Sequence, residues 1–417
     1  MAFAIFIVTY AFIAGTRLPW LKLDRPGAAL LGAVLMVVFG VVTPREVFNH
    51  SVDPSLHAVD MDTLVLLLAM MMLASYLTHA AFFRAIGYHA VRLAKTPRML
   101  LIALGVASAV LSAILVNDTV CLMLAPLTLA VVEEAQLPPV PYLFAVCLAS
   151  NAGSLATFTG NPQNMLIQGA SGLSYASFAT YMALPAVLST TAVLGVLLFA
   201  FRKELPRHRF APRPPPPPVN RWLMALCGIT LAGVITAFFA GLPMSWSALA
   251  GAAVVMALAG HSPREMLEKV DFVLLLFFAS LFVVVYGVHK EGWVESTRHI
   301  LAPLTHGSAV QEIFGFASLT VLASNLLSNV PYVMVARHWV PAMQSPVLGW
   351  HVLSLASTLA GNLTLIGSMA NLIVFEAARE RARVSFWQFF RIGAPATLIS
   401  LLLGLAALWG EHALLPP

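Results

Sequence analysis

Two clusters of polar residues interrupt apolar, helix-length runs in the first half of the chain. The first covers residues 116–119 (Val-Asn-Asp-Thr), and the second covers residues 159–164 (Thr-Gly-Asn-Pro-Gln-Asn). Hydrocarbon tolerates unwound backbone only where protein covers it or where it lines a water-filled cavity. The two clusters are therefore candidate binding-site backbone rather than ordinary loops.

Asp118 is the titratable group of these clusters, and its neighbours in sequence include no basic residue. A carboxyl at membrane depth is costly to keep, so it is a functional candidate by default. Because loss of water favours the neutral carboxylic acid, Asp118 suits a residue that takes up and releases a proton. The alternative is a helix N-cap at a hairpin tip, with Asp118 or Thr119 accepting from backbone N–H groups. The two roles can coexist.

The second cluster predicts a broken helix. Gly160 and Pro162 interrupt the apolar run, and Pro162 suits the first turn of a helix that resumes there. Two half-helices whose ends meet at one point supply N–H donors and free carbonyl acceptors. Residues 366–371 in the second half keep the Gly and the Asn but lack the Pro. The alternative is a kink that neighbouring helices satisfy.

A second tip follows at residues 327–332 (Leu-Ser-Asn-Val-Pro-Tyr), where Val330 stands in place of Asp118. One titratable group is therefore expected at the centre of the site. Asp118 is the candidate proton-coupling residue. The candidate substrate-binding residues are Asn117, Thr119, Gly160, Asn161, Gln163, Asn164, Ser328, Asn329, Gly367, Ser368 and Asn371.

Neither tip and neither break contains a Lys or Arg. A multivalent anion would then depend on helix dipoles, bound sodium ions or a charge from elsewhere. A small neutral hydroxylated acid needs only hydroxyl, amide and backbone partners. The composition of the clusters favours the neutral substrate.

The overall composition excludes most soluble classes. Of 417 residues, 59% are hydrophobic and 10% are charged, whereas a soluble domain carries about a quarter charged residues. The chain is therefore expected to be an all-α polytopic membrane protein that binds no nucleic acid. Three scattered cysteines fit neither a disulfide framework nor a zinc site. Because no metal-ligand spacing, phosphate-binding loop or nucleophile elbow occurs, we expect neither an enzyme nor a metal. Glu376 is expected to pair with Arg379.

Apolar runs close to the length of a membrane span set the helix prediction. In the first half these are 2–15, 27–43, 63–82, a pair at 98–116 and 119–134, an interrupted run at 141–168, and 176–201. In the second half they are 222–240, 244–260, 272–289, a pair at 309–327 and 330–343, an interrupted run at 347–378, and 386–410.

The second series repeats the first. Asn117 recurs as Asn329, 212 positions later, and Asn164 recurs as Asn371, 207 positions later. We expect a first repeat at 1–202, a proline-rich linker at 203–220 and a second repeat at 221–417. If each pair is a re-entrant hairpin, each half crosses the membrane about five times, and the halves are inverted relative to one another.

The basic residues support this topology. With the linker in the cytoplasm, all but four of the 23 Lys and Arg residues fall on the cytoplasmic side, as the positive-inside rule requires. The exceptions are Arg45, Lys290, Arg298 and Arg337. The expected location is a bacterial plasma (inner) membrane, with the linker cytoplasmic.

The motifs at 116–121, 150–154, 160–167 and 328–332 together resemble the ion transporter superfamily, in particular its arsenite-permease-like branch. They are similar to those of silicic acid effluxers and their bacterial relatives. The resemblance covers nearly the whole chain. It implies two inverted repeats with re-entrant hairpins and broken helices, and an elevator-like motion of a transport part against a scaffold that often dimerises. An acidic first tip is similar to proton-coupled members, whereas sodium–carboxylate relatives carry Ser-Asn-Thr at both tips.

These observations predict a secondary active antiporter that exchanges an inward proton for an outgoing neutral oxyacid: arsenite, antimonite or silicic acid, with arsenous acid first. The alternatives are a sodium- or proton-coupled carboxylate or sulfate transporter, a passive neutral-solute channel and a sodium/proton antiporter. No cofactor is expected. The proton gradient is the expected driving force, with sodium as the alternative. The expected partners are the oxyacid and the lipid bilayer, while a homodimer and a cytoplasmic ATPase subunit remain open.

Overall fold

The computed structural model describes residues 1–13, 23–48, 58–205, 217–294, 296–297 and 308–414. Within these ranges the chain is helical and contains no β-strand. The first half holds α1 (Ala2–Ile13), α2 (Arg25–Val38), α3 (Pro44–Phe48), α4 (Met61–His79), α5 (Phe82–Leu93), α6 (Pro97–Ile114), α7 (Asn117–Glu134), α8 (Pro139–Ser154), η2 (Phe158–Gly160), α9 (Pro162–Ser171) and α10 (Tyr175–Ala200).

The second half follows the same order. It holds α11 (Arg221–Phe239), α12 (Met244–Leu258), α13 (Pro263–Leu267), α14 (Phe272–Lys290), α16 (Ala309–Leu327), α17 (Asn329–Ala336), η3 (Val340–Ala342), α18 (Pro346–Ala360), η4 (Leu365–Gly367), α19 (Met369–Ala377) and α20 (Phe386–Leu414). Among the described residues, seven helices are long and apolar enough to cross a membrane: α4, α6, α10, α11, α14, α16 and α20. The prediction of an all-α polytopic membrane protein is confirmed.

Every predicted apolar run contains a helix, and both predicted interruptions are present. The apolar runs did not predict α5, because this helix is short and amphipathic. Arg84 and Arg92 lie on its outer side, whereas Phe83 and Val91 are buried. The short helices α3 and α13 were missed for lack of an apolar run. Most of the linker, residues 206–216, lies outside the described residues, as do Arg17, Lys22 and Arg298.

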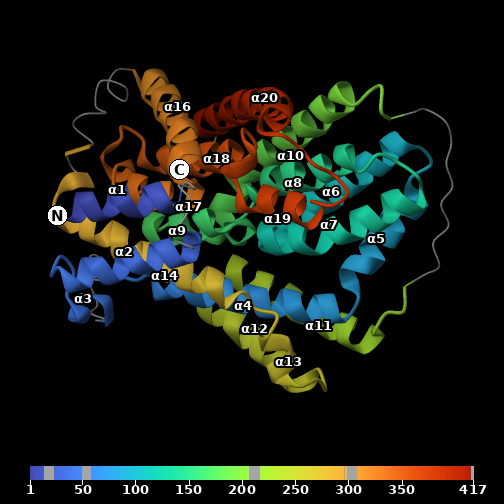
Figure 1. The fold of residues 1–417 in the computed structure, drawn as a ribbon, viewed down its shortest axis with the longest axis horizontal. Helices are drawn as coiled ribbons and strands as arrows, with labels where there is room; N and C mark the ends of the chain where they lie inside the picture. Colours follow the sequence, from blue (N-terminus) through green and yellow to red (C-terminus); the bar gives the residue numbers. More distant parts are fainter. Residues whose placement is uncertain (14–22, 49–57, 206–216, 295, 298–307, 415–417) are drawn as a thin grey trace.

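The helices cross-pack between the two halves. α2 packs along α14, and its counterpart α12 packs along α4. α8 and α18 lie at the centre, with α10 and α20 on one side and α4 and α14 on the other (Figure 1). This exchange of partners is what two units related by an approximate two-fold axis produce. The inversion of the halves relative to the membrane stays a prediction.

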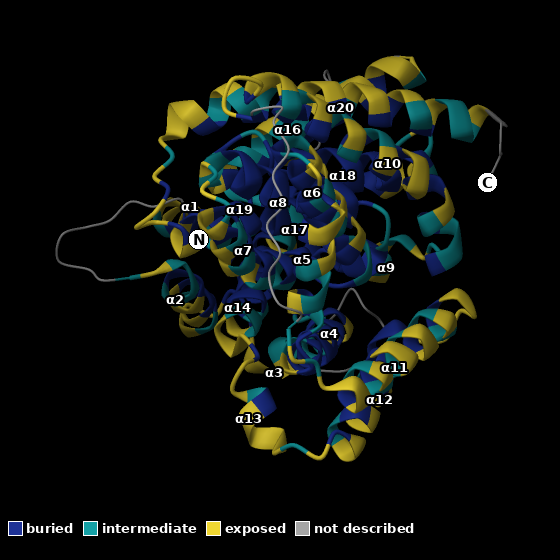
Figure 2. Ribbon diagram, turned by 90° about the vertical axis from the view of Figure 1, so that its right-hand side faces the viewer, coloured by how far each residue is buried: buried dark blue, intermediate teal, exposed yellow. Residues whose placement is uncertain are grey.

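Burial follows this arrangement. All residues of α8 from Pro141 to Ser154 are buried, as is α18 from Leu348 to Ala360. Figure 2 shows these helices as the buried centre, with exposed residues along α11, α12 and α20. The exposed side chains of α11 and α12 include Trp222, Ile229 and Trp246, which suits contact with lipid.

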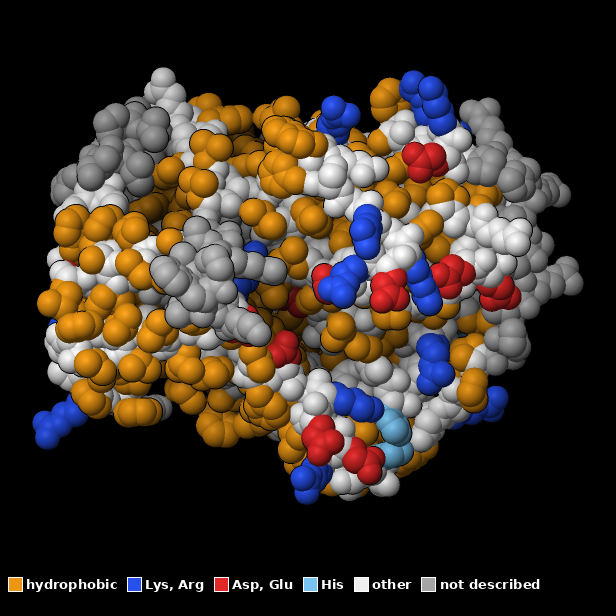
Figure 3. Space-filling view, viewed as in Figure 1, with side chains coloured by type: hydrophobic (Ala, Val, Ile, Leu, Met, Phe, Trp, Pro, Cys, Tyr) orange, Lys and Arg blue, Asp and Glu red, His pale blue; other side chains and the backbone are white. Residues whose placement is uncertain are grey.

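Charged side chains are unevenly distributed over the surface. In Figure 3 most of the visible Lys and Arg side chains gather on the right half, and the left half is largely apolar. Arg98 holds the start of the linker, because its guanidinium donates to the carbonyls of Leu205 (3.3 Å) and Arg202 (3.4 Å). On this face, the basic and acidic side chains thus gather toward the same end of the molecule, and the side of the membrane on which the linker lies stays a prediction.

Candidate functional site

The first break is built as the sequence predicts. Asn161 is the N-cap of α9 and accepts a hydrogen bond from the Asn164 N–H at 2.8 Å, with Pro162 in the first turn. Gly160 is required here by close approach, because a Cβ on it would overlap the carbonyl of Ser154. At the second break Ser368 takes the N-cap position of α19 and accepts from the Ala370 N–H at 3.2 Å.

Two equivalent asparagines hold the broken helices together. Asn164 Nδ2 donates to the carbonyls of Ser154 (3.2 Å) and Thr157 (3.0 Å), at and just beyond the end of α8. Asn371 Nδ2 donates to the carbonyls of Gly361 (2.7 Å) and Thr364 (3.1 Å), 207 positions on in each case. A side-chain amide thus replaces the helical hydrogen bonds that each break removes.

These amides orient a buried chain of asparagines. Because carbonyls only accept, Asn371 must turn its NH2 group to Gly361 and Thr364 and its Oδ1 toward Asn151. Asn151 Nδ2 donates to Asn371 Oδ1 at 3.3 Å and to Asn362 Oδ1 at 2.9 Å. Asn151 Oδ1 then accepts from Asn117 Nδ2 at 3.1 Å and from Ser368 Oγ at 3.2 Å. The orientation of the Asn117 amide at the first tip therefore follows from backbone carbonyls at the second break.

Each tip carries an amide oxygen without a partner. Asn117 Oδ1 and Asn329 Oδ1 are buried and accept no hydrogen bond from the described residues. A buried acceptor without a donor is costly, so native structures rarely keep one without a ligand or water to satisfy it. The two equivalent oxygens are thus candidate ligand contacts.

Asn117 and Asn329 both line a cavity of about 30 Å³, here called the inner pocket. Both tips and both breaks contribute to it. Its lining is Asn117, Asp118, Pro162, Gln163, Phe277, Phe278, Ser328, Asn329, Val330, Pro331, Ser368 and Met369. The inner pocket brings together six of the predicted site residues, together with Val330 in place of a second acid. It has no Lys or Arg in its lining.

A second, wider cavity of about 270 Å³ adjoins Asp118 and is here called the vestibule. Its lining is Met71, Ser75, Thr78, Asp118, Thr119, Leu122, Met123, Lys269, Asp271, Leu274, Met369 and Ile373. Asp118 lies at position N2 of α7, so the N-cap alternative is wrong; the N-cap is Val116. Among the described residues Asp118 has no ion-pair partner, and it lines both cavities.

The other predicted residues lie behind the pocket. Asn161, Asn164 and Asn371 are fully buried, and protein groups occupy their amides. Gly160 and Gly367 allow close approach of the backbone to Ser154 and Asn325. These five residues position the breaks, and the inner pocket is lined by their neighbours.

Sequence reasoning missed three charged residues. Lys269 and Asp271 precede α14 and line the vestibule. Nothing in the neighbouring sequence indicates that they lie near Asp118. Arg25, at the start of α2, is half-buried, and its Nη1 lies 3.6 Å from Met369 Sδ at the second break. Residues this far apart in sequence meet only through the packing of α2, α14 and α19. Asn151, Thr358 and Asn362 were also missed, although they are polar residues in fully buried helical segments.

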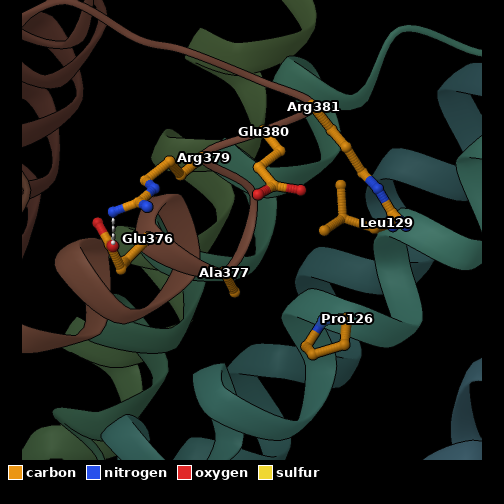
Figure 4. Close-up of a pocket in the computed structure, with 7 residues that line it drawn as sticks. All are labelled: Pro126, Leu129, Glu376, Ala377, Arg379, Glu380 and Arg381. Carbon is orange, nitrogen blue, oxygen red and sulfur yellow. Dashed lines mark hydrogen bonds and ion pairs between the residues drawn. The ribbon is translucent and has the colours of Figure 1, made fainter.

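A third cavity, of about 440 Å³, lies between α7 and the end of α19 (Figure 4). Pro126 and Leu129 form one wall and residues 376–381 the other. Arg379 pairs with Glu376 at 3.0 Å, which confirms the predicted pair, and Arg381 pairs with Glu133 at 3.0 Å. Both pairs are largely exposed, so they contribute little to stability. Because both arginines already have protein partners, this cavity is a weaker candidate for a binding site than the inner pocket.

The fold and the site define a class: a polytopic membrane transporter built from two similar halves around broken helices. Residues 5–360 match the family model described as "CitMHS: Citrate transporter". The chain belongs to this family, within the ion transporter superfamily, and is a secondary transporter.

Several characterised and uncharacterised proteins are similar along their whole length. A silicon efflux transporter of Oryza sativa subsp. japonica is 30% identical over 97% of this chain and 96% of its own. An uncharacterized transporter of Mycobacterium tuberculosis (strain CDC 1551 / Oshkosh) is 32% identical over 98% of both chains. A Dictyostelium discoideum transporter that bears the name arsB is 25% identical over 96% of this chain and 90% of its own. The solved YdaH transporter of Alcanivorax borkumensis shares the fold, with a TM-score of 0.57 at 17% identity over 100% of this chain and 97% of its own.

Proposed function

We propose that the protein exports a small neutral oxyacid, arsenite, antimonite or silicic acid, in exchange for an inward proton. The observation that carries the proposal is the pair of unpartnered amide oxygens, Asn117 Oδ1 and Asn329 Oδ1, at the inner pocket. Buried acceptors are satisfied by a ligand that donates hydrogen bonds or by a cation, and a neutral oxyacid is a ligand of the first kind. A neutral oxyacid donates through its hydroxyl groups. An ionised carboxylate or sulfate only accepts, and the lining of the inner pocket offers it no cationic side chain.

Asp118 provides the coupling in this proposal. As a carboxylate it accepts a hydroxyl hydrogen bond from the oxyacid, beside the two amide oxygens. When Asp118 takes up a proton it becomes a donor and loses part of this acceptor set, so the oxyacid leaves. Bound substrate opposes protonation and bound proton opposes substrate, which is the reciprocity that exchange requires. The names of the silicon efflux and arsB relatives support the same substrate class.

A proton- or sodium-coupled anion transporter is the second candidate. Two observations favour it: Lys269 lines the vestibule, and Arg25 lies beside the second break. The description of the matched family names citrate. These cations stand outside the inner pocket, however, whereas the orphan acceptors belong to residues that line it. A passive channel would not require those acceptors. A sodium/proton antiporter could use them as sodium ligands, so sodium-driven proton movement without oxyacid exchange in the flux test below would indicate that function instead.

The proposal includes the setting of the transporter. We place it in a bacterial inner membrane with residues 203–220 in the cytoplasm, and it moves in an elevator-like manner. The exposed apolar side chains of α11 and α12 suit either lipid or a second copy of the chain. A homodimer therefore remains a proposal, as does a cytoplasmic ATPase subunit.

The test is flux in proteoliposomes with an imposed pH gradient, using arsenite, silicic acid and citrate with and without sodium. Wild type should accumulate a neutral oxyacid against its gradient, and Asp118→Asn should not. Glu133→Gln is the matched control, because Glu133 lies on the same helix, is half-exposed and pairs only with Arg381 among the described residues. Sodium-dependent citrate uptake without oxyacid exchange would replace this function by the anion transporter. Equal equilibration by both proteins would indicate a channel.

A further inference from the structure

The vestibule and the inner pocket share two lining residues, Asp118 and Met369. Asp118 comes from α7 in the first half, and Met369 begins α19 in the second half. A solute that moves from the vestibule to the inner pocket must therefore pass between a carboxyl group and a thioether. The inner pocket, at about 30 Å³, has room for only about two water molecules. An oxyacid is larger, so the lining must move to admit it.

Met369 is the part of this lining best able to move. A methionine side chain has three rotatable bonds and repacks at low cost. Both Asp118 and Met369 lie in the first turn of a helix, but α7 has 18 residues and α19 has nine, and α19 starts directly after η4, which ends at Gly367.

Arg25 holds Met369 from outside. Its Nη1 donates to Met369 Sδ at 3.6 Å, and this is its only hydrogen bond to the described residues. A half-buried guanidinium ordinarily takes a carboxylate, and a thioether is a weak acceptor. Such a contact is strong enough to select one position of a flexible side chain and weak enough to be given up.

We propose that Met369 is the constriction between the vestibule and the inner pocket, and that Arg25 is the positioning residue that holds it closed. Release of the thioether opens the passage beside Asp118. Passage of substrate is thereby controlled by a contact between α2 and the second break. The inference goes beyond the proposed function, because it holds for any solute that reaches the inner pocket through the vestibule.

The test measures access rather than transport. Gln163→Cys places a thiol in the inner pocket, here called the pocket reporter, and Thr78→Cys places one in the vestibule, the vestibule reporter. The native Cys121, Cys147 and Cys227 are buried, and the unmodified parent measures their background. Each reporter is reacted with 2-aminoethyl methanethiosulfonate in inside-out vesicles, with elution as a single size-exclusion peak as the check on folding. The variants are Met369→Ala, Met369→Leu and Arg25→Gln, with Met123→Leu as the matched control because Met123 lines the vestibule alone.

Met369→Ala should raise the reaction rate of the pocket reporter most. Arg25→Gln and Met369→Leu should each raise it by about three- to tenfold, the effect of one weak hydrogen bond. Met369→Leu keeps the volume and removes the sulfur acceptor, so it separates the contact from simple packing. The vestibule reporter should react at one rate throughout, and Met123→Leu should change neither reporter.

Three outcomes contradict the proposal. An unchanged rate at the pocket reporter in Met369→Ala overturns the constriction, and an unchanged rate in Arg25→Gln overturns the role of Arg25. A parallel rise at the vestibule reporter would mean general loosening and would also overturn the proposal. Because no transport is measured, failure here is distinct from failure of the proposed function.

Discussion

The two helix breaks are nearly alike, whereas the two tips differ. At the breaks, Asn164 and Asn371 donate to equivalent pairs of carbonyls in their own halves. Thr157 donates to the Ala113 carbonyl on α6, and its counterpart Thr364 donates to Asn325 Oδ1 on α16. At the tips, Asp118 in the first half stands where the second half has Val330, and both residues line the inner pocket. The repeated features hold the backbone and supply the two equivalent amide oxygens of Asn117 and Asn329. The feature that differs, the acid of the first tip, is the candidate for proton coupling. A duplicated frame leaves its asymmetric positions free to specialise.

The largest effect should come from the acid that only one tip carries. Asp118→Asn should lower proton-driven exchange by about two orders of magnitude, the range lost when a proton-transferring side chain is removed. Adding Val330→Asp to that variant should not restore exchange, since Val330 lines the inner pocket but not the vestibule. The measurement is exchange rate in proteoliposomes at fixed pH gradient. Recovery in the double variant would show that the tips are interchangeable and would break the comparison.

The next effect concerns the breaks. Asn164→Leu and Asn371→Leu should each destabilise the protein by about 1–3 kcal/mol. Each removes two amide hydrogen bonds to buried carbonyls, of which the Thr157 and Thr364 carbonyls keep a backbone donor. Both should lower the midpoint of thermal unfolding in detergent, while the exposed Gln388→Leu on α20 should leave it unchanged. A large effect in one half alone would mean that the breaks are alike in shape but not in their contribution to stability.

Loss of the unpartnered amide oxygen of Asn329, at the second tip, should not lower stability, in contrast to the loss of Asn164 or Asn371. Asn329→Leu removes a buried acceptor that no described residue satisfies, so stability should be equal or higher by about 1 kcal/mol. Substrate affinity, measured by isothermal calorimetry or by the concentration dependence of exchange, should fall about tenfold for one lost hydrogen bond to a ligand. If stability falls as it does for Asn371→Leu, then Asn329 has a structural role, and only Asn117 Oδ1 remains as a candidate ligand contact.

Sequence reasoning succeeded where local rules decide the structure. Gly160 and Pro162 predict an interruption and a helix start, and both are present. It failed where residues distant in sequence meet. Nothing near Arg25 in sequence points to Met369, 344 positions away, and nothing near Lys269 points to Asp118. The helix period can indicate that Asn151 is buried, but its hydrogen bonds to Asn362 and Asn371 depend on how the two halves pack.

The smallest effect should come from backbone strain that the tips do not share. Ser328 has φ +74° and ψ 155°, a region that essentially only glycine occupies freely, whereas the equivalent Val116 has φ −63°. Ser328→Gly should therefore raise stability by about 1 kcal/mol, less the entropy that glycine loses on folding. Val116→Gly should lower it, because no strain is relieved there. Thermal unfolding of the two variants measures the difference. Equal losses in both would show that the second tip is unstrained, and the asymmetry would then reduce to Asp118 against Val330.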